Sequence, residues 1–132
     1  MDKYEIAKKL MNCFPNSFIN SSGEFIAHHT GEYFNFENCE TLLDVQCKVI
    51  EWFSRAAYKS EPYNSSHKNK KLHSFMLDGI NKFLGTEFTE NDMETIYTYL
   101  GNAIKHSKTI EFIESGYDMT FFNQFKKQPT FF

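Results

Sequence analysis

The fold class is decided by residues 17–36, which have the sequence SFINSSGEFIAHHTGEYFNF. Three short apolar segments, at residues 17–20, 25–28 and 33–36, are separated by polar turns of four residues that each contain one glycine. Short apolar segments joined by glycine-containing turns are typical of antiparallel hairpins. This stretch therefore predicts a small β-meander of three antiparallel strands.

Helical periodicity dominates the sequence on both sides of this stretch. Residues 1–14 predict a short helix that Pro15 ends. In residues 41–116, apolar side chains recur every three or four residues, as at Val45, Val49 and Trp52. We expect an α+β fold class, in which the small N-terminal meander packs against a bundle of about four to five helices.

Local signals predict where these helices begin and end. Thr41 with Asp44, and again Thr89 with Asp92, have the spacing of a capping box, in which each side chain binds an otherwise unpaired backbone N–H. Gly85 follows an apolar run and is expected to end a helix in the left-handed conformation. A chain of 132 residues can bury one core, so residues 1–132 are predicted to form a single domain.

The charge of the chain argues against DNA binding as its main activity. The net charge is −3, and Arg55 is the only arginine, although arginine is the preferred residue for contacts with phosphates and bases. Lys68, Lys70 and Lys71 form a local basic patch that is still a candidate binding surface. They fall in the first turns of a predicted helix. Cations are unfavourable at that end of a helix dipole. These lysines form either a solvated turn or a contact for RNA, a DNA backbone or an acidic protein surface.

Acidic side chains form a second candidate surface. Glu90, Asp92 and Glu94 lie in the first turns of a predicted helix. Carboxylates there stabilise the helix dipole, which explains them without a partner. If they cluster on the surface, they could instead mimic a phosphate backbone and occupy a basic groove.

A metal site is an open alternative at His28, His29, Cys39 and Cys47, which fall within one stretch of 20 residues. Zinc takes four such ligands, usually as two closely spaced pairs. Adjacent strand residues point to opposite faces, and both cysteines could bind one metal only if Cys39 precedes the helix and its loop folds back. The competing interpretation is a buried Cys47, a partly covered Cys39 and ordinary histidines, with no cofactor.

The sequence contains none of the common catalytic signatures, such as a phosphate-binding glycine loop, His-Glu-x-x-His or Gly-x-Ser-x-Gly. We therefore expect no enzymatic activity. It also contains no signal peptide and no apolar stretch of about 20 residues. These observations predict a cytoplasmic protein with reduced thiols and no membrane partner.

The tail, residues 117–132, is rich in phenylalanine. Exposed phenylalanines at a chain end favour association. The tail is therefore expected either to fold back onto the core or to dock onto a second copy, which would give a homodimer. Its phenylalanines are Phe121, Phe122, Phe125, Phe131 and Phe132.

Four segments, at residues 18–28, 44–55, 75–81 and 96–102, together resemble small proteins of phages and prophages of low-GC Gram-positive bacteria. The resemblance covers most of the chain but not the tail after about Met119. It implies a phage accessory protein that disarms host defence, an anti-CRISPR protein whose partner is a CRISPR effector nuclease or its guide-RNA complex. It assigns no site residue.

Two further interpretations stay open, namely a nucleic-acid-binding regulatory protein of the phage and a small protein with a structural zinc ion. The candidate partner contacts are Arg55, Lys68, Lys70 and Lys71, or else Glu90, Asp92 and Glu94.

Overall fold

The computed structural model describes residues 2–27, 33–59, 67–101 and 106–126, with side chains described for residues 2–27, 33–53, 76–100 and 106–126. Within these ranges it has an α+β fold, as predicted. The N-terminal elements are α1 (Lys3–Cys13), β1 (Ser17–Ile19), β2 (Glu24–Ala27) and β3 (Tyr33–Asn35). The helical elements are α2 (Leu42–Lys59), α3 (His67–Leu84), α4 (Glu90–Ile96), the π-helix η1 (Tyr97–Gly101), α5 (His106–Glu114) and the 3-10 helix η2 (Met119–Phe125).

The three strands form the predicted antiparallel meander, in the order β1-β2-β3. Phe18 lies opposite Ile26 on β2, and Phe25 on β2 lies opposite Phe34 on β3. The first turn is closed by the side chain of Asn20, whose Oδ1 accepts hydrogen bonds from the backbone N–H groups of Ser22 and Glu24. Because successive strand residues face opposite sides, Phe25 and Phe34 are buried while Phe18 is exposed.

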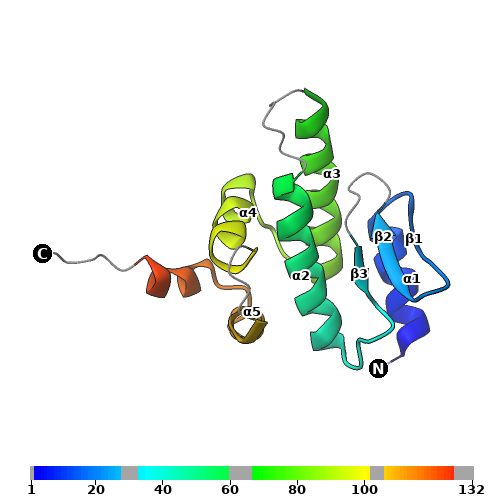
Figure 1. Ribbon diagram of the computed structural model, residues 1–132. Helices are drawn as coiled ribbons and strands as arrows, with labels where there is room; N and C mark the ends of the chain where they lie inside the picture. Colours follow the sequence, from blue (N-terminus) through cyan, green and yellow to red (C-terminus); the bar gives the residue numbers. More distant parts are fainter. Residues whose placement is uncertain (1, 28–32, 60–66, 102–105, 127–132) are drawn as a thin grey trace, which may run out of the picture.

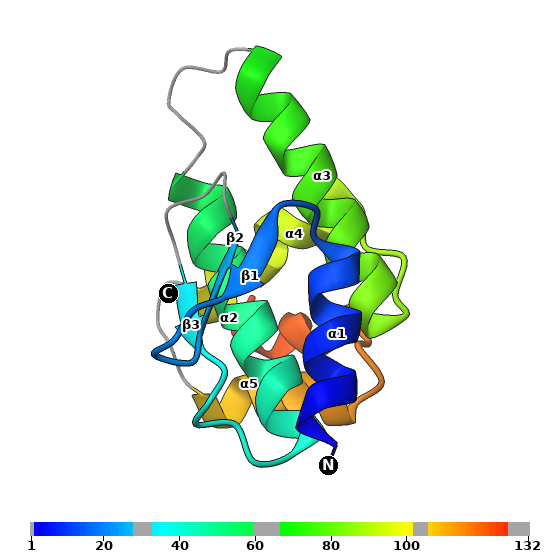
Figure 2. The same cartoon turned by 90° about the vertical axis from the view of Figure 1, so that its right-hand side faces the viewer.

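The elements form three layers (Figure 1). Helices α2 and α3 pack against each other in the middle. The sheet and α1 cover one side of this pair, where α1 contacts α3 and β3 contacts α2. On the other side, α5 and η1 pack against α2. The view turned by 90° shows α1 running beside α3 (Figure 2).

Both predicted capping boxes are present. The carboxylate of Asp44 accepts hydrogen bonds from the backbone N–H groups of Glu40 (2.8 Å) and Thr41 (3.0 Å), and the Thr41 hydroxyl accepts one from the Asp44 N–H. Thr89 and Asp92 form the same reciprocal pair at the start of α4. Gly85 ends α3 with a φ of +74°, where its N–H donates to the carbonyl of Asn81, as predicted.

The helix that begins at the Thr89–Asp92 capping box changes from α-helix to π-helix at Tyr97. The core lies on both sides of α2. On the sheet side, the Trp52 indole meets the rings of Phe14 and Phe25 edge-on, with centroids 5.2 and 5.5 Å away. On the other side, the rings of Phe112 and Phe122 lie 4.7 Å apart. Among the described residues, no helix combines the length and apolarity needed to cross a membrane.

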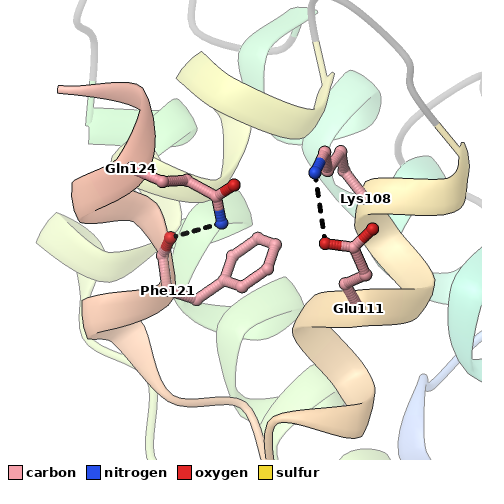
Figure 3. A network of polar contacts seen from close by, with 4 residues as sticks. All are labelled: Lys108, Glu111, Phe121 and Gln124. Atoms are coloured by element: carbon pink, nitrogen blue, oxygen red, sulfur yellow. Dashed lines mark hydrogen bonds and ion pairs between the residues drawn. The ribbon is translucent and has the colours of Figure 1, made fainter. Parts of the chain in front are cut away.

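The described part of the phenylalanine-rich tail folds back onto the core. Phe122 is fully buried, and both Phe122 and Phe125 stack on Tyr99, at 5.9 and 5.5 Å. The ring of Phe121 points from η2 toward α5 (Figure 3). Phe131 and Phe132 lie outside the described residues.

The contact between α1 and α3 depends on Gly79. A Cβ atom at this position would lie 2.4 Å from Cε1 of Phe14 and 2.8 Å from the carbonyl oxygen of Cys13. The second neighbour is backbone and cannot rotate away. Glycine is therefore required here for the close approach of the two helices.

Gly79→Ala is expected to lower the free energy of unfolding by about 1–2 kcal/mol. Overpacking costs about 1–3 kcal/mol, which outweighs the gain of about 1 kcal/mol in helix propensity. Urea denaturation gives the value. Asp78→Ala, at the neighbouring exposed position of α3, is the control and should stay within about 0.5 kcal/mol of the wild type. A Gly79→Ala protein more stable than the wild type would contradict the close contact.

Phe122→Ala is expected to cost about 3–5 kcal/mol, because it removes a fully buried aromatic side chain. Phe18→Ala, at a position that is 45% exposed, should cost far less and serves as the control. Chemical denaturation compares the two. If both variants lose the same small amount, η2 does not belong to the core.

Candidate functional site

A buried carboxylate joins α2 to α5. Glu51 is only 8% exposed, and its Oε2 lies 2.8 Å from Nδ1 of His106. His106 is the first residue of α5, and its side chain is 49% exposed. The contact therefore lies at the edge of the core, where the imidazole covers the carboxylate from the solvent side.

Other polar side chains surround this pair. Cys47 lies one helical turn before Glu51 on α2, and Thr109 lies one turn after His106 on α5. The hydroxyls of Thr109 and Tyr117 are buried, and neither has a hydrogen-bond partner among the described residues. The backbone of Tyr117 has a φ of +60°, which is uncommon for a residue other than glycine.

Cys47 is not suited to act as a nucleophile. Burial, together with the nearby carboxylates of Glu51 and Asp44, raises the pKa of its thiol to about 12. Burial likewise raises the pKa of Tyr117 to about 12, with a smaller contribution from Cys47. Because the thiolate is the reactive form of cysteine, a thiol that keeps its proton at neutral pH is inert. Within this group of polar residues, the Glu51–His106 contact is the one that joins α5 to α2, and Cys47 is not an activated nucleophile.

The predicted zinc ligands are only partly described. Cys39 precedes α2, which meets one condition for the site, and both Cys39 and Cys47 are buried free thiols. Burial also raises the pKa of Cys39, which opposes the deprotonation that zinc binding needs. The described residues contain no group of three potential metal ligands. His28 and His29 lie outside the described residues, so the four-residue site stays a prediction that elemental analysis can test.

The predicted basic contacts lie on two helices. Arg55 belongs to α2, and Lys68, Lys70 and Lys71 belong to the first turns of α3. Their side chains lie outside the described ones. The backbone of these turns of α3 projects past the other helices (Figure 2).

The predicted acidic contacts divide into two roles. Asp92 accepts a hydrogen bond from the Thr89 N–H at 2.9 Å, so its carboxylate serves the capping box. Glu90 and Glu94 are exposed, and neither forms an ion pair with a described side chain. Among the described side chains, none competes with a partner for these two carboxylates.

One polar residue that positions α4 was not singled out from the sequence. The side chain of Asn81 accepts hydrogen bonds from the Phe88 N–H (2.8 Å) and the Thr86 hydroxyl (2.7 Å), and it donates to the Phe88 carbonyl (3.0 Å). One amide thus fixes the loop between α3 and α4. An asparagine near the end of a helix is too common a feature to predict this.

A scan against protein-family models, a search of curated proteins and a search of solved structures each found no match for this chain. The function is therefore inferred from the residues and their arrangement.

The stability of the protein is expected to fall with rising pH between about pH 9 and 12. The pKa of Cys47 is about 12 in the folded protein against an ordinary value of 9.0. In this window the unfolded chain releases the thiol proton while the folded chain retains it, so unfolding becomes more favourable as pH rises.

Urea denaturation between about pH 8 and 10.5 measures this slope. Cys47→Ala should make it shallower, while Tyr117, whose pKa is also raised, preserves part of it. The comparison uses slopes because the substitution also leaves a small cavity. Identical slopes in both proteins would rule out a contribution from Cys47.

Proposed function

We propose that this protein is a phage-encoded inhibitor of a host defence system, an anti-CRISPR protein that blocks an RNA-guided nuclease by direct binding. The four segments that resemble phage and prophage proteins support the class of protein. The observation that carries the mode of action is the pair of exposed carboxylates, Glu90 and Glu94, on the firmly held helix α4.

The position of α4 is fixed before any partner binds. The side chain of Asn81 holds the preceding loop, and the Thr89–Asp92 capping box holds the first turn. Met93 and Ile96 anchor the inner face of α4 in the core. A surface held in this way loses little conformational entropy on binding, which favours affinity.

The charge of this surface complements the proposed target. Glu87, in the loop before α4, is also exposed and forms no ion pair with a described side chain. RNA-guided nucleases hold the guide–target duplex in a positively charged channel. Carboxylates at Glu87, Glu90 and Glu94 would compete for the cations of that channel, since complementary charge steers association and sets specificity.

A function by binding alone also agrees with the unreactive state of the buried polar side chains between α2 and α5. Cys47 retains its proton, and Glu51 is engaged by His106. An inhibitor that works by occupancy needs complementarity and a few anchoring side chains, with no reacting group.

The first test is an affinity pull-down of the tagged protein from a CRISPR-bearing Gram-positive host, read by mass spectrometry. Recovery of the effector nuclease near one-to-one is expected, followed by inhibition of target cleavage by the purified pair. Recovery of no defence protein from that host would count against this function there.

Replacing both free carboxylates, as Glu90→Gln with Glu94→Gln, is expected to weaken binding to the captured nuclease about 10-fold, mainly through a slower association rate. The control is Glu37→Gln with Glu114→Gln, which removes the same charge from exposed positions on other elements. Surface plasmon resonance measures both rates. An equal effect of the two double variants would show that overall charge, and not the surface of α4, governs binding.

A further inference from the structure

A cavity of about 360 Å³ lies between α1 and the C-terminal part of α3. It lies beside the place where Gly79 allows α3 to approach Cys13 and Phe14 at the end of α1. Its lining residues are Glu5, Lys8, Lys9, Asn12, Cys13 and Lys82.

The charge of this cavity is strongly positive. Three lysines line it against one carboxylate, in a protein whose net charge is −3. None of Lys8, Lys9 and Lys82 forms an ion pair with a described side chain. The ammonium groups of Lys82 and Lys9 both act to lower the pKa of the Cys13 thiol at the cavity, although burial is the larger effect and raises it.

Aromatic rings position two of these cations. Nζ of Lys9 lies 5.3 Å from the ring centroid of Phe83, and Nζ of Lys8 lies 5.4 Å from that of Tyr4. The Tyr4 ring is 70% exposed, the largest exposure among the big hydrophobic side chains of the described part. An exposed aromatic ring therefore lies beside a cluster of cations that form no ion pair with a described side chain.

We propose that the groove between α1 and α3 binds single-stranded nucleic acid, with Lys8, Lys9 and Lys82 contacting phosphates and Tyr4 stacking on a base. Proteins that bind single strands combine a positive groove with aromatic side chains on which bases stack. Asn12 adds an amide that can hydrogen-bond to a base or a sugar.

The side chains of the groove favour single-stranded nucleic acid over a duplex or an acidic peptide. A stacking ring is useful only for an unpaired base, which an acidic peptide or a duplex does not offer. The groove lacks arginine, the usual bidentate partner of guanine, and Asn12 is the one amide that lines it. Most of its contacts are therefore expected to be with phosphates, so binding should be largely tolerant of sequence. Binding is expected to be tight only at low salt, because salt weakens the contacts between the groove lysines and the phosphates.

This inference is independent of the proposed inhibitor function. The residues that line the groove belong to α1 and the C-terminal part of α3. α1 and α4 lie on opposite sides of the central helix pair (Figure 1). Lys8 and Lys9 of the groove lie on α1, whereas Glu90 and Glu94 lie on α4, so substitutions at these positions test the two proposals separately.

Fluorescence polarisation with a labelled single-stranded RNA of about 12 nucleotides of mixed sequence tests the proposal. The wild type should bind at about 50 mM salt and bind much more weakly at about 200 mM salt. Lys9→Gln with Lys82→Gln should weaken binding about 10-fold and make the dependence of log K on log salt concentration shallower by about 1.4, since each phosphate contact on a single strand contributes about 0.7.

Tyr4→Ala distinguishes stacking from simple charge attraction. It should weaken binding about 5- to 100-fold, the range for the loss of one stacked base, while the salt dependence stays the same. Phe18→Ala, which removes another exposed ring, should have no effect. Lys48→Gln with Lys108→Gln removes the same charge elsewhere and should change affinity by less than about twofold.

Thermal unfolding of each variant verifies that it is folded before binding is measured. The proposal is overturned if the wild type fails to bind the RNA at low salt, or if the two lysine pairs weaken binding equally. It is also overturned if the duplex of the same sequence, or a polyglutamate peptide, binds more tightly than the single strand.

Discussion

The indole of Trp52 on α2 is enclosed by the rings of Phe14, Phe25 and Phe34, and this burial joins three separate segments of the chain. Phe14 follows α1, while Phe25 and Phe34 belong to the sheet. The same helix presents Glu51 to α5. α2 therefore lies between the two parts of the core and contacts elements on both sides, namely β3 on one side and α5 and η1 on the other.

Those parts of the fold that depend on neighbouring residues could be predicted from the sequence. The meander and the two capping boxes arise within a few residues, so their signals lie in short patterns. The Glu51–His106 pair could not be predicted, because it joins residues 55 positions apart. The groove that brings Lys82 next to Lys8 and Lys9 is likewise a product of the packing of α1 on α3. The π-helix η1 has no sequence signal that we recognise.

The candidate contacts were predicted only in part. Glu90 and Glu94 are exposed as a binding surface requires, whereas Asp92 is engaged in the capping box. Sequence patterns cannot separate these roles, since an acidic residue in a first helical turn serves either one. The molecule thus has two charged surfaces of opposite sign, in layers separated by α2 and α3. The overall net charge of −3 does not reveal that the two charges are separated in this way.

The sequence separation of the paired elements affects how the chain folds and how it opens locally. Every strand pairs with its neighbour in sequence, so the sheet forms through short loops at a small entropic cost. The docking of α1 on α3 closes a much longer stretch of chain, and it depends on one glycine. Local opening of α1 breaks this long-range contact, and it exposes the amides of α1 to hydrogen exchange. A ligand held between α1 and α3 would slow that exchange by tying the first helix to the rest of the domain.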